Sequence, residues 1–214
     1  MTTALQGVNL ATLTSSAAPS LQEFVLQGSI LDGSCDALIH RLQALCDNVD
    51  DGIETFKDHE IVFIIRTGPN QPVQLRGRRS LDHINMPWQL RYVGQSDVSD
   101  KNRSVTVRSF LDSCASENLP QFLQEIGFRI EYEFVAEGHM FRKGKMKITV
   151  SKIYKMPKPG QLDGLEPMTM SRLVELSVVA PSGSDTVADD MRTFAEQLKP
   201  LVTMEKVMPV MTMK

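Results

Sequence analysis

The chain has 214 residues, of which 42% are hydrophobic and 23% are charged, and its formal net charge at pH 7 is −3. These proportions are typical of a globular protein and exclude a largely disordered, collagen-like or disulfide-stapled chain. Its apolar runs are far shorter than the ~20 residues of a membrane-spanning helix, and residues 1–20 lack the basic and apolar regions of a secretory signal.

We expect a single folded domain over residues 21–207, between a flexible N-terminal tail (1–20) and a C-terminal tail (208–214). The domain begins with a strand over 23–30. An amphipathic helix over 36–48 follows, because its apolar residues recur every three or four positions. The next segments are a continuous apolar strand and three strands of alternating apolar and polar residues, at 61–65, 73–79, 88–92 and 105–108.

In the second half, Asn118 and Gln121 form a capping-box pattern that predicts a short helix ending at Gly127. Phe122 and Ile126 are expected on its inward side. From residue 128 the period returns to two, and the remaining elements are two strands with a turn at Gly138, a strand at 174–178, a helix over 186–202 and a short strand at 204–207.

The apolar stripe of the last helix includes Met191 and Phe194, which we expect in the core. Strands outnumber helices, and no strict alternation of strand and helix runs through the chain. The sequence therefore predicts a β-rich α+β fold with antiparallel strands, and it disfavours a parallel doubly wound sheet.

Basic residues gather in two stretches, 66–108 and 129–158, each with 8 basic and 3 acidic residues. Such stretches are typical either of a phosphate- or nucleic-acid-binding surface or of the solvent side of strands. Arg76, Arg78 and Arg91 alternate with apolar residues, and we interpret these three arginines as candidate contacts to a protein partner. Trp88 then belongs to the core, and no direct sequence-specific binding of nucleic acid is expected.

The sequence lacks the common phosphate-binding, nucleophile-elbow, zinc-protease and calcium-loop motifs, and its three cysteines form no CxxC pair. We therefore expect no catalytic residue, no cofactor and no metal site. A second hypothesis is a barrel that binds or hydrolyses polyphosphate, in which Glu131 and Glu133 face rows of basic residues on other strands. Such enzymes carry an ExExK pattern on the first strand. Here Glu23 is followed at alternate positions by Val25 and Gln27, which argues against that alternative.

Several blocks in order resemble the metazoan type of the Mediator subunit 18 family over residues 23–207, among them LQGSILD (26–32), RRSLDHINMPWQLRYVG (78–94) and SENLPQFLQEIGFRIEYEFVAEGHMFRKG (116–144). The resemblance implies an antiparallel β-barrel with flanking helices, similar to the triphosphate tunnel (CYTH-like) fold.

The same resemblance implies a non-catalytic interaction subunit of the Mediator head module, located in the nucleus, that links regulators to RNA polymerase II. Its implied partners are the related barrel subunit 20, a C-terminal helix of subunit 8, other head-module subunits and the polymerase. The resemblance assigns no contact residues.

Overall fold

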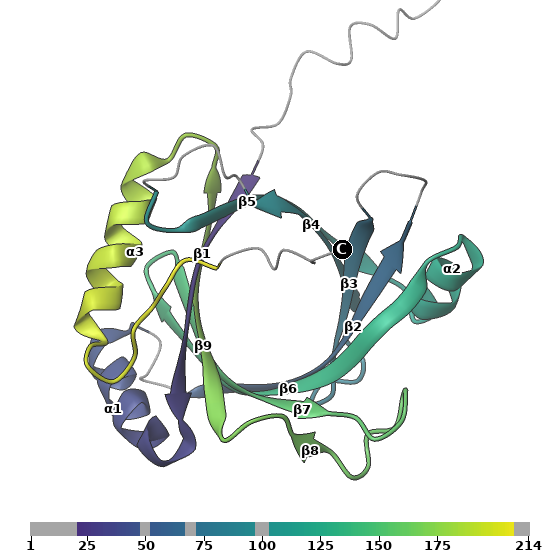
Figure 1. Cartoon of the computed structure of the whole chain (residues 1–214), viewed down its shortest axis with the longest axis horizontal. Coiled ribbons are helices and arrows are strands. Elements are labelled where there is room, and N and C mark those ends of the chain that lie inside the picture. The colour runs from purple at the N-terminus through teal and green to yellow at the C-terminus, as the bar shows by residue number, and fades with distance from the viewer. Residues whose placement is uncertain (1–20, 48–51, 67–71, 97–102, 208–214) are drawn as a thin grey trace, which may run out of the picture.

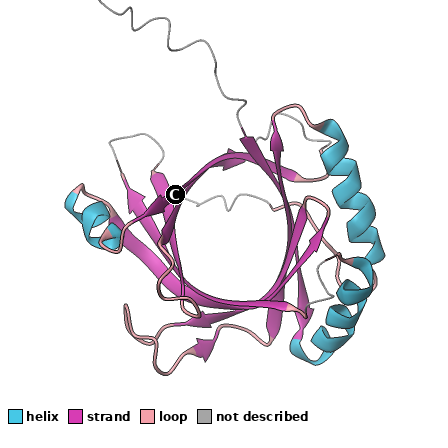
Figure 2. Cartoon of the chain, turned by 180° about the vertical axis from the view of Figure 1, so that it is seen from behind, coloured by secondary structure: helices cyan, strands magenta, loops and turns pink. Residues whose placement is uncertain are grey.

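A computed structural model describes residues 21–47, 52–66, 72–96 and 103–207, so the two tails expected at 1–20 and 208–214 lie outside the described residues. The described chain forms a closed, strongly curved antiparallel sheet with helices on its outer side (Figures 1 and 2). None of the helices in this part of the chain has the length and apolar character of a membrane span.

The strands are β1 (Leu21–Leu31), β2 (Glu54–Ile65), β3 (Val73–Ser80), β4 (Trp88–Ser96), β5 (Thr106–Ala115), β6 (Arg129–Lys143), β7 (Met146–Lys155), β8 (Glu166–Pro167) and β9 (Ser171–Pro181). Their order in the sheet is β6-β2-β3-β4-β5-β1-β9-β7-β8, and pairing of β6 with β7 closes eight of them into a barrel, leaving β8 at the edge of β7. The predicted antiparallel barrel is confirmed.

The helical elements are η2 (Asp32–Ser34), α1 (Cys35–Leu45), α2 (Leu119–Glu125) and α3 (Asp185–Gln197). α1 and α3 lie side by side against the outer wall formed by β1 and β9 (Figure 1). α2 lies on another part of the barrel, where Leu119 and Leu123 pack with Phe63 and Trp88.

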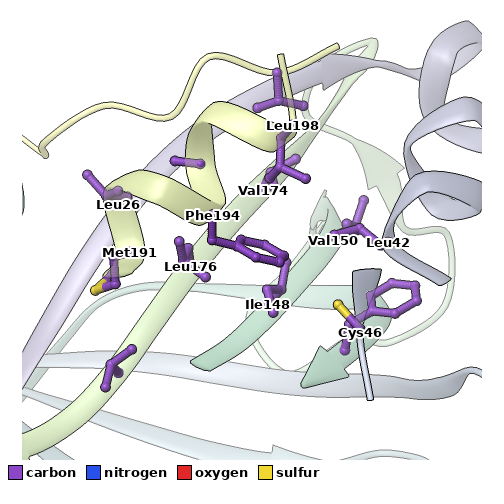
Figure 3. Packing of buried hydrophobic residues seen from close by; sticks show 14 of the residues in the cluster. Leu26, Leu42, Cys46, Ile148, Val150, Val174, Leu176, Met191, Phe194 and Leu198 are labelled. Atoms are coloured by element: carbon purple, nitrogen blue, oxygen red, sulfur yellow. The ribbon is translucent and has the colours of Figure 1, made fainter. Parts of the chain in front are cut away.

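The hydrophobic core lies between the barrel wall and its helices. On β1, Phe24 and Leu26 point outward into this layer, which also contains Met191 and Phe194 of α3. Figure 3 labels Leu26, Met191 and Phe194 within it. Met191 is 0% exposed and Phe194 is 4% exposed, so their predicted burial is confirmed. Because side chains alternate along a strand, the residues between these apolar positions point into the barrel.

The prediction of a turn at Gly138 is wrong, because β6 continues through this residue and stays paired with β7 up to Lys143. A Cβ atom at position 138 would lie 2.1 Å from the carbonyl oxygen of Val150, so glycine permits the close approach of two strands here. The turn between β6 and β7 instead contains Gly144, whose φ of +54° favours glycine.

The short helix α2 also differs from the expectation. Phe122 is 52% exposed and Ile126 is 51% exposed, because a helix of only seven residues turns a single narrow stripe, Leu119 and Leu123, toward the barrel. Asn118 makes no side-chain capping bond; its Oδ1 instead accepts a hydrogen bond from the Ser116 hydroxyl. The expected strand at 204–207 is reduced to one isolated bridge, between Glu205 and β1.

Candidate functional site

The barrel encloses a cavity of about 1290 Å³, which we call the lumen. On β1, Glu23 and Gln27 line it, while the apolar residues between them pack on the outside. The ionisable residues of its lining carry both signs of charge in equal number. They are the cations Arg76, Arg78, Arg91, Arg108, Lys145, Lys147 and Lys155, and the carboxylates Glu23, Asp58, Glu60, Asp112, Glu131, Glu133 and Glu175.

Glu23 stands at the centre of an ion-pair cluster on the lumen wall. Its carboxylate oxygens lie 2.9 Å from Nη1 of Arg91 and 2.8 Å from Nη2 of Arg108, and its side chain is only 4% exposed. Arg91 also donates two hydrogen bonds, of 2.7 and 2.6 Å, to the carboxylate of Asp112. Burial acts to lower the pKa of Arg91, but the hydrogen bond to Asp112 and the charge of Glu23 outweigh burial and raise it. The carboxylates and guanidinium groups of this cluster therefore stabilise one another in their charged forms.

The three arginines proposed as partner contacts all line the lumen and so do not lie on the outer wall. Arg78 donates hydrogen bonds of 3.2 and 2.5 Å to the amide oxygen of Gln89, and its Nε lies 3.8 Å from Asp58. Among the described residues, Nε of Arg76 is buried without a hydrogen-bond partner. A role of Arg76, Arg78 and Arg91 in partner binding stays a prediction, but a partner would have to enter the barrel to reach them.

Trp88 is 5% exposed on the opposite face of β4, which confirms that it belongs to the core. There its ring lies edge-on to His59, with centroids 6.1 Å apart, and the guanidinium of Arg79 lies 5.9 Å from its centroid.

Burial in the lumen shifts the pKa of further lining groups toward their neutral forms, among them Lys147 and Glu60. It lowers the pKa of Lys147, which the nearby charge of Arg78 lowers further. It also raises the pKa of Glu60, against the opposing effect of Arg78. Shifts of this kind accompany groups held in a confined space with little water. In the lumen, the positive and negative side chains therefore balance one another, and some of them are partly removed from water.

The two glutamates considered for a metal site have separate partners. Glu133 lies 2.8 Å from Nε2 of His59 and accepts a hydrogen bond of 2.9 Å from the backbone N–H of Gly160. Glu131 accepts a hydrogen bond of 3.1 Å from the side-chain amide of Gln74. Within the described ranges, no group of three or more His, Cys, Asp and Glu side chains is arranged to hold a metal ion.

The cluster around Glu23 was not recognised from the sequence. The alternation Glu23, Val25, Gln27 against Phe24 and Leu26 signals that the polar side chains share one face. The partners of Glu23 lie on β4 and β5, however, and only the strand register brings them together.

Comparison with known proteins gives a consistent result. A family model described as Med18 protein matches residues 22–209. The chain is 53% identical over 190 residues to "Mediator of RNA polymerase II transcription subunit 18" of Danio rerio, covering 89% of this chain and 90% of that protein. The Drosophila melanogaster protein of the same name is 50% identical over 187 residues, covering 86% and 85%.

Two solved structures show the same fold. A chain of the Schizosaccharomyces pombe Mediator head module superimposes with a TM-score of 0.70 at 16% identity, covering 87% of this chain and 98% of that one. The RNA triphosphatase domain of a mimivirus mRNA capping enzyme gives a TM-score of 0.54 at 12% identity, covering 86% and 92%. At these identities the likeness concerns architecture alone.

Proposed function

Since this chain belongs to the Med18 family, we propose that it is a structural subunit of the Mediator head module, the part of the coactivator that links regulators to RNA polymerase II. The observation that carries the proposal is the 53% identity, over nearly the full length of both chains, to a protein named as Mediator subunit 18. The barrel shared with a chain of the S. pombe head module supports it. The site of action is then the nucleus.

The proposal assigns no catalytic activity to the barrel. A hydrolase of this architecture must bind a metal ion and a polyphosphate in its lumen. Here the lumen row of β1 reads Glu23, Val25 and Gln27, and its one carboxylate is already ion-paired with both Arg91 and Arg108. The purified chain should release no phosphate from tripolyphosphate with Mg²⁺ or Mn²⁺. Metal-dependent release that disappears in the Glu131→Gln, Glu133→Gln double variant would favour the phosphohydrolase alternative instead.

The partners we assign are the related barrel subunit 20, a C-terminal helix of subunit 8, further head-module subunits and RNA polymerase II. Apolar side chains on the outer wall support protein contacts, since clusters of exposed apolar residues mark interaction surfaces. Tyr92 and Leu111 face each other across β4 and β5 and are 40% and 72% exposed. A tagged chain should recover head-module subunits from nuclear extract, as identified by mass spectrometry. Recovery of unrelated complexes only would contradict the proposal.

The proposed contacts Arg76, Arg78 and Arg91 need a test adapted to their place in the lumen. Charge reversal at Arg91 would set a third carboxylate beside Glu23 and Asp112, so it would disturb the fold. The variant Arg78→Gln, which removes the charge without adding a carboxylate beside Asp58 and Glu60, is compared instead with Tyr92→Ser on the outer wall, after thermal unfolding shows that both are folded.

If the arginines contact a partner, Arg78→Gln lowers the recovery of head-module subunits. If only Tyr92→Ser lowers recovery, the contact surface is the outer wall, and the arginines are not contacts.

A further inference from the structure

The last described residues run along the edge of β1. β9 pairs with β1 over its whole length, whereas β5 pairs with it only over Gln22–Val25. Beyond that point the edge facing β5 is taken by Glu205, which exchanges two backbone hydrogen bonds of 2.9 and 2.7 Å with Gln27. The chain after α3 therefore completes the barrel wall at the place where β5 leaves β1.

From Glu205 the chain reaches the lumen face. The hydroxyl of Thr106 donates a hydrogen bond of 3.1 Å to the carbonyl oxygen of Val207. Thr106 precedes Arg108 by two positions on β5, so both side chains lie on the same face of the strand, and Arg108 lines the lumen. Thr106 is 1% exposed, so this part of the lumen face is covered. Val207 thus lies on the inner side of the wall.

We propose that the C-terminal segment, residues 208–214 (MPVMTMK), occupies the lumen of its own barrel. Seven extended residues reach about 24 Å. Eight strands about 4.8 Å apart, tilted by about 40°, enclose a barrel about 16 Å across between backbones. The segment is therefore long enough to cross the lumen from its starting point at Val207.

The chemistry of the segment matches the apolar part of the lining. Met208, Val210, Met211 and Met213 supply apolar side chains, and methionine adapts to irregular spaces. The lumen offers Phe134, Met140, Ile153, Met156 and Leu173 as apolar contacts. Burying such side chains against one another is worth roughly 25 cal/mol for each Å² removed from water.

The charges of the lumen favour this mostly apolar occupant over a polyanion. Positive and negative side chains are equal in number in the lining. Glu23 and Asp112 together balance the charges of Arg91 and Arg108, and Arg78 lies close to Asp58, so little net positive charge remains to attract phosphate groups. The C-terminal segment carries no charged side chain before Lys214.

The proposal is tested by thiol labelling of the full chain in a Cys114→Ser background, because the other two native cysteines are buried. Met211→Cys is compared with Met170→Cys, a matched substitution at a side chain that is 77% exposed. We expect a maleimide to label position 211 at least about tenfold more slowly than position 170, since labelling must wait for the segment to leave the lumen. Equal labelling rates would overturn the proposal.

A second measurement locates the segment. Val93 lines the lumen, whereas its neighbour Tyr92 lies on the outer wall of β4. A short bismaleimide should join Met211→Cys to Val93→Cys within one chain and should not join it to Tyr92→Cys. Deleting residues 208–214 should speed the labelling of Val93→Cys by at least about tenfold.

Equal cross-linking of Met211→Cys to Val93→Cys and to Tyr92→Cys would overturn the proposal. An unchanged labelling rate of Val93→Cys after deletion of residues 208–214 would also overturn it. Products of twice the chain's mass would mean that a second copy supplies the segment, which also overturns it.

Discussion

Replacing Glu23 with glutamine tests whether charges in the lumen hold the barrel wall together. The amide keeps the shape of the side chain but removes the negative charge that lies 2.9 Å from Arg91 and 2.8 Å from Arg108. Arg91 retains Asp112, whereas Arg108, whose side chain is 16% exposed, loses its ion-pair partner. The variant therefore leaves one largely buried cation without a carboxylate partner among the described residues.

The expected loss of stability follows from this geometry. Removing one partner of a buried ion pair costs about 3–5 kcal/mol. Because Arg91 is 32% exposed and keeps a second carboxylate, we place the loss in the free energy of unfolding at about 2–4 kcal/mol. For a chain of this length each kcal/mol shifts the Tm by roughly 2–4 °C, so the Tm should fall by roughly 4–16 °C.

The loss is measured by urea unfolding followed by circular dichroism at neutral pH. Asp112→Asn is the matched control, because it also removes a carboxylate from Arg91 but at a side chain that is 44% exposed, and it should cost about 1 kcal/mol or less. Combining Glu23→Gln with Arg108→Gln should cost less than the two single losses added together. If Glu23→Gln costs no more than Asp112→Asn, water screens the lumen charges and the reasoning fails.

Three further predictions concern the outer layers. Phe194→Ala empties a site that is 4% exposed between α3 and the barrel and should cost about 3–5 kcal/mol in the same urea assay; near-native stability would mean that the helix stripe faces another chain. A hydrogen bond from Lys143 lowers the pKa of Asp47, so its stabilisation is present above the ordinary aspartate pKa and is lost as the pH falls through the lowered one. The Tm of Asp47→Asn should therefore lie below that of the native chain at neutral pH and converge with it in acid, whereas a constant difference would refute this. Burial raises the pKa of Cys46 to about 11, so iodoacetamide at neutral pH should modify the exposed Cys114 and spare Cys46, as read by mass spectrometry; equal modification would contradict that burial.

Alternating residues predicted the antiparallel strands well, because a period of two reports which side chains share a face of a strand, whereas the closed barrel was implied by the family resemblance. The burial of Trp88 followed from this alternation, and the burial of Phe194 followed from the three- and four-residue spacing of apolar residues in its helix. The pattern does not say which face is the inside of a closed sheet. Here the apolar face points outward to the helices and the polar face points inward, so Arg76, Arg78 and Arg91 lie in the lumen and not on an outer surface.

Other features depended on contacts between distant parts of the chain. Glu23 and Arg91 are 68 residues apart, and their ion pair exists only in the register of the folded barrel. Gly138 shows a related difficulty, because glycine is suited both to a turn and to close packing of two strands. Only the position of Val150 on the neighbouring strand distinguishes the two.

The pairing of β1 with β9 has a consequence for the nascent protein. Leu26 lies opposite Leu176, so the first strand meets its longest partner about 150 residues later in synthesis. At about 5–20 residues per second, the ribosome needs roughly 8–30 s to supply that partner. The helix α3, which covers the outer side of the same strand, is made later still. Throughout this interval the edge of β1 that pairs with β9 is open and the apolar face that packs on α3 is uncovered, and both features favour aggregation of newly made chains.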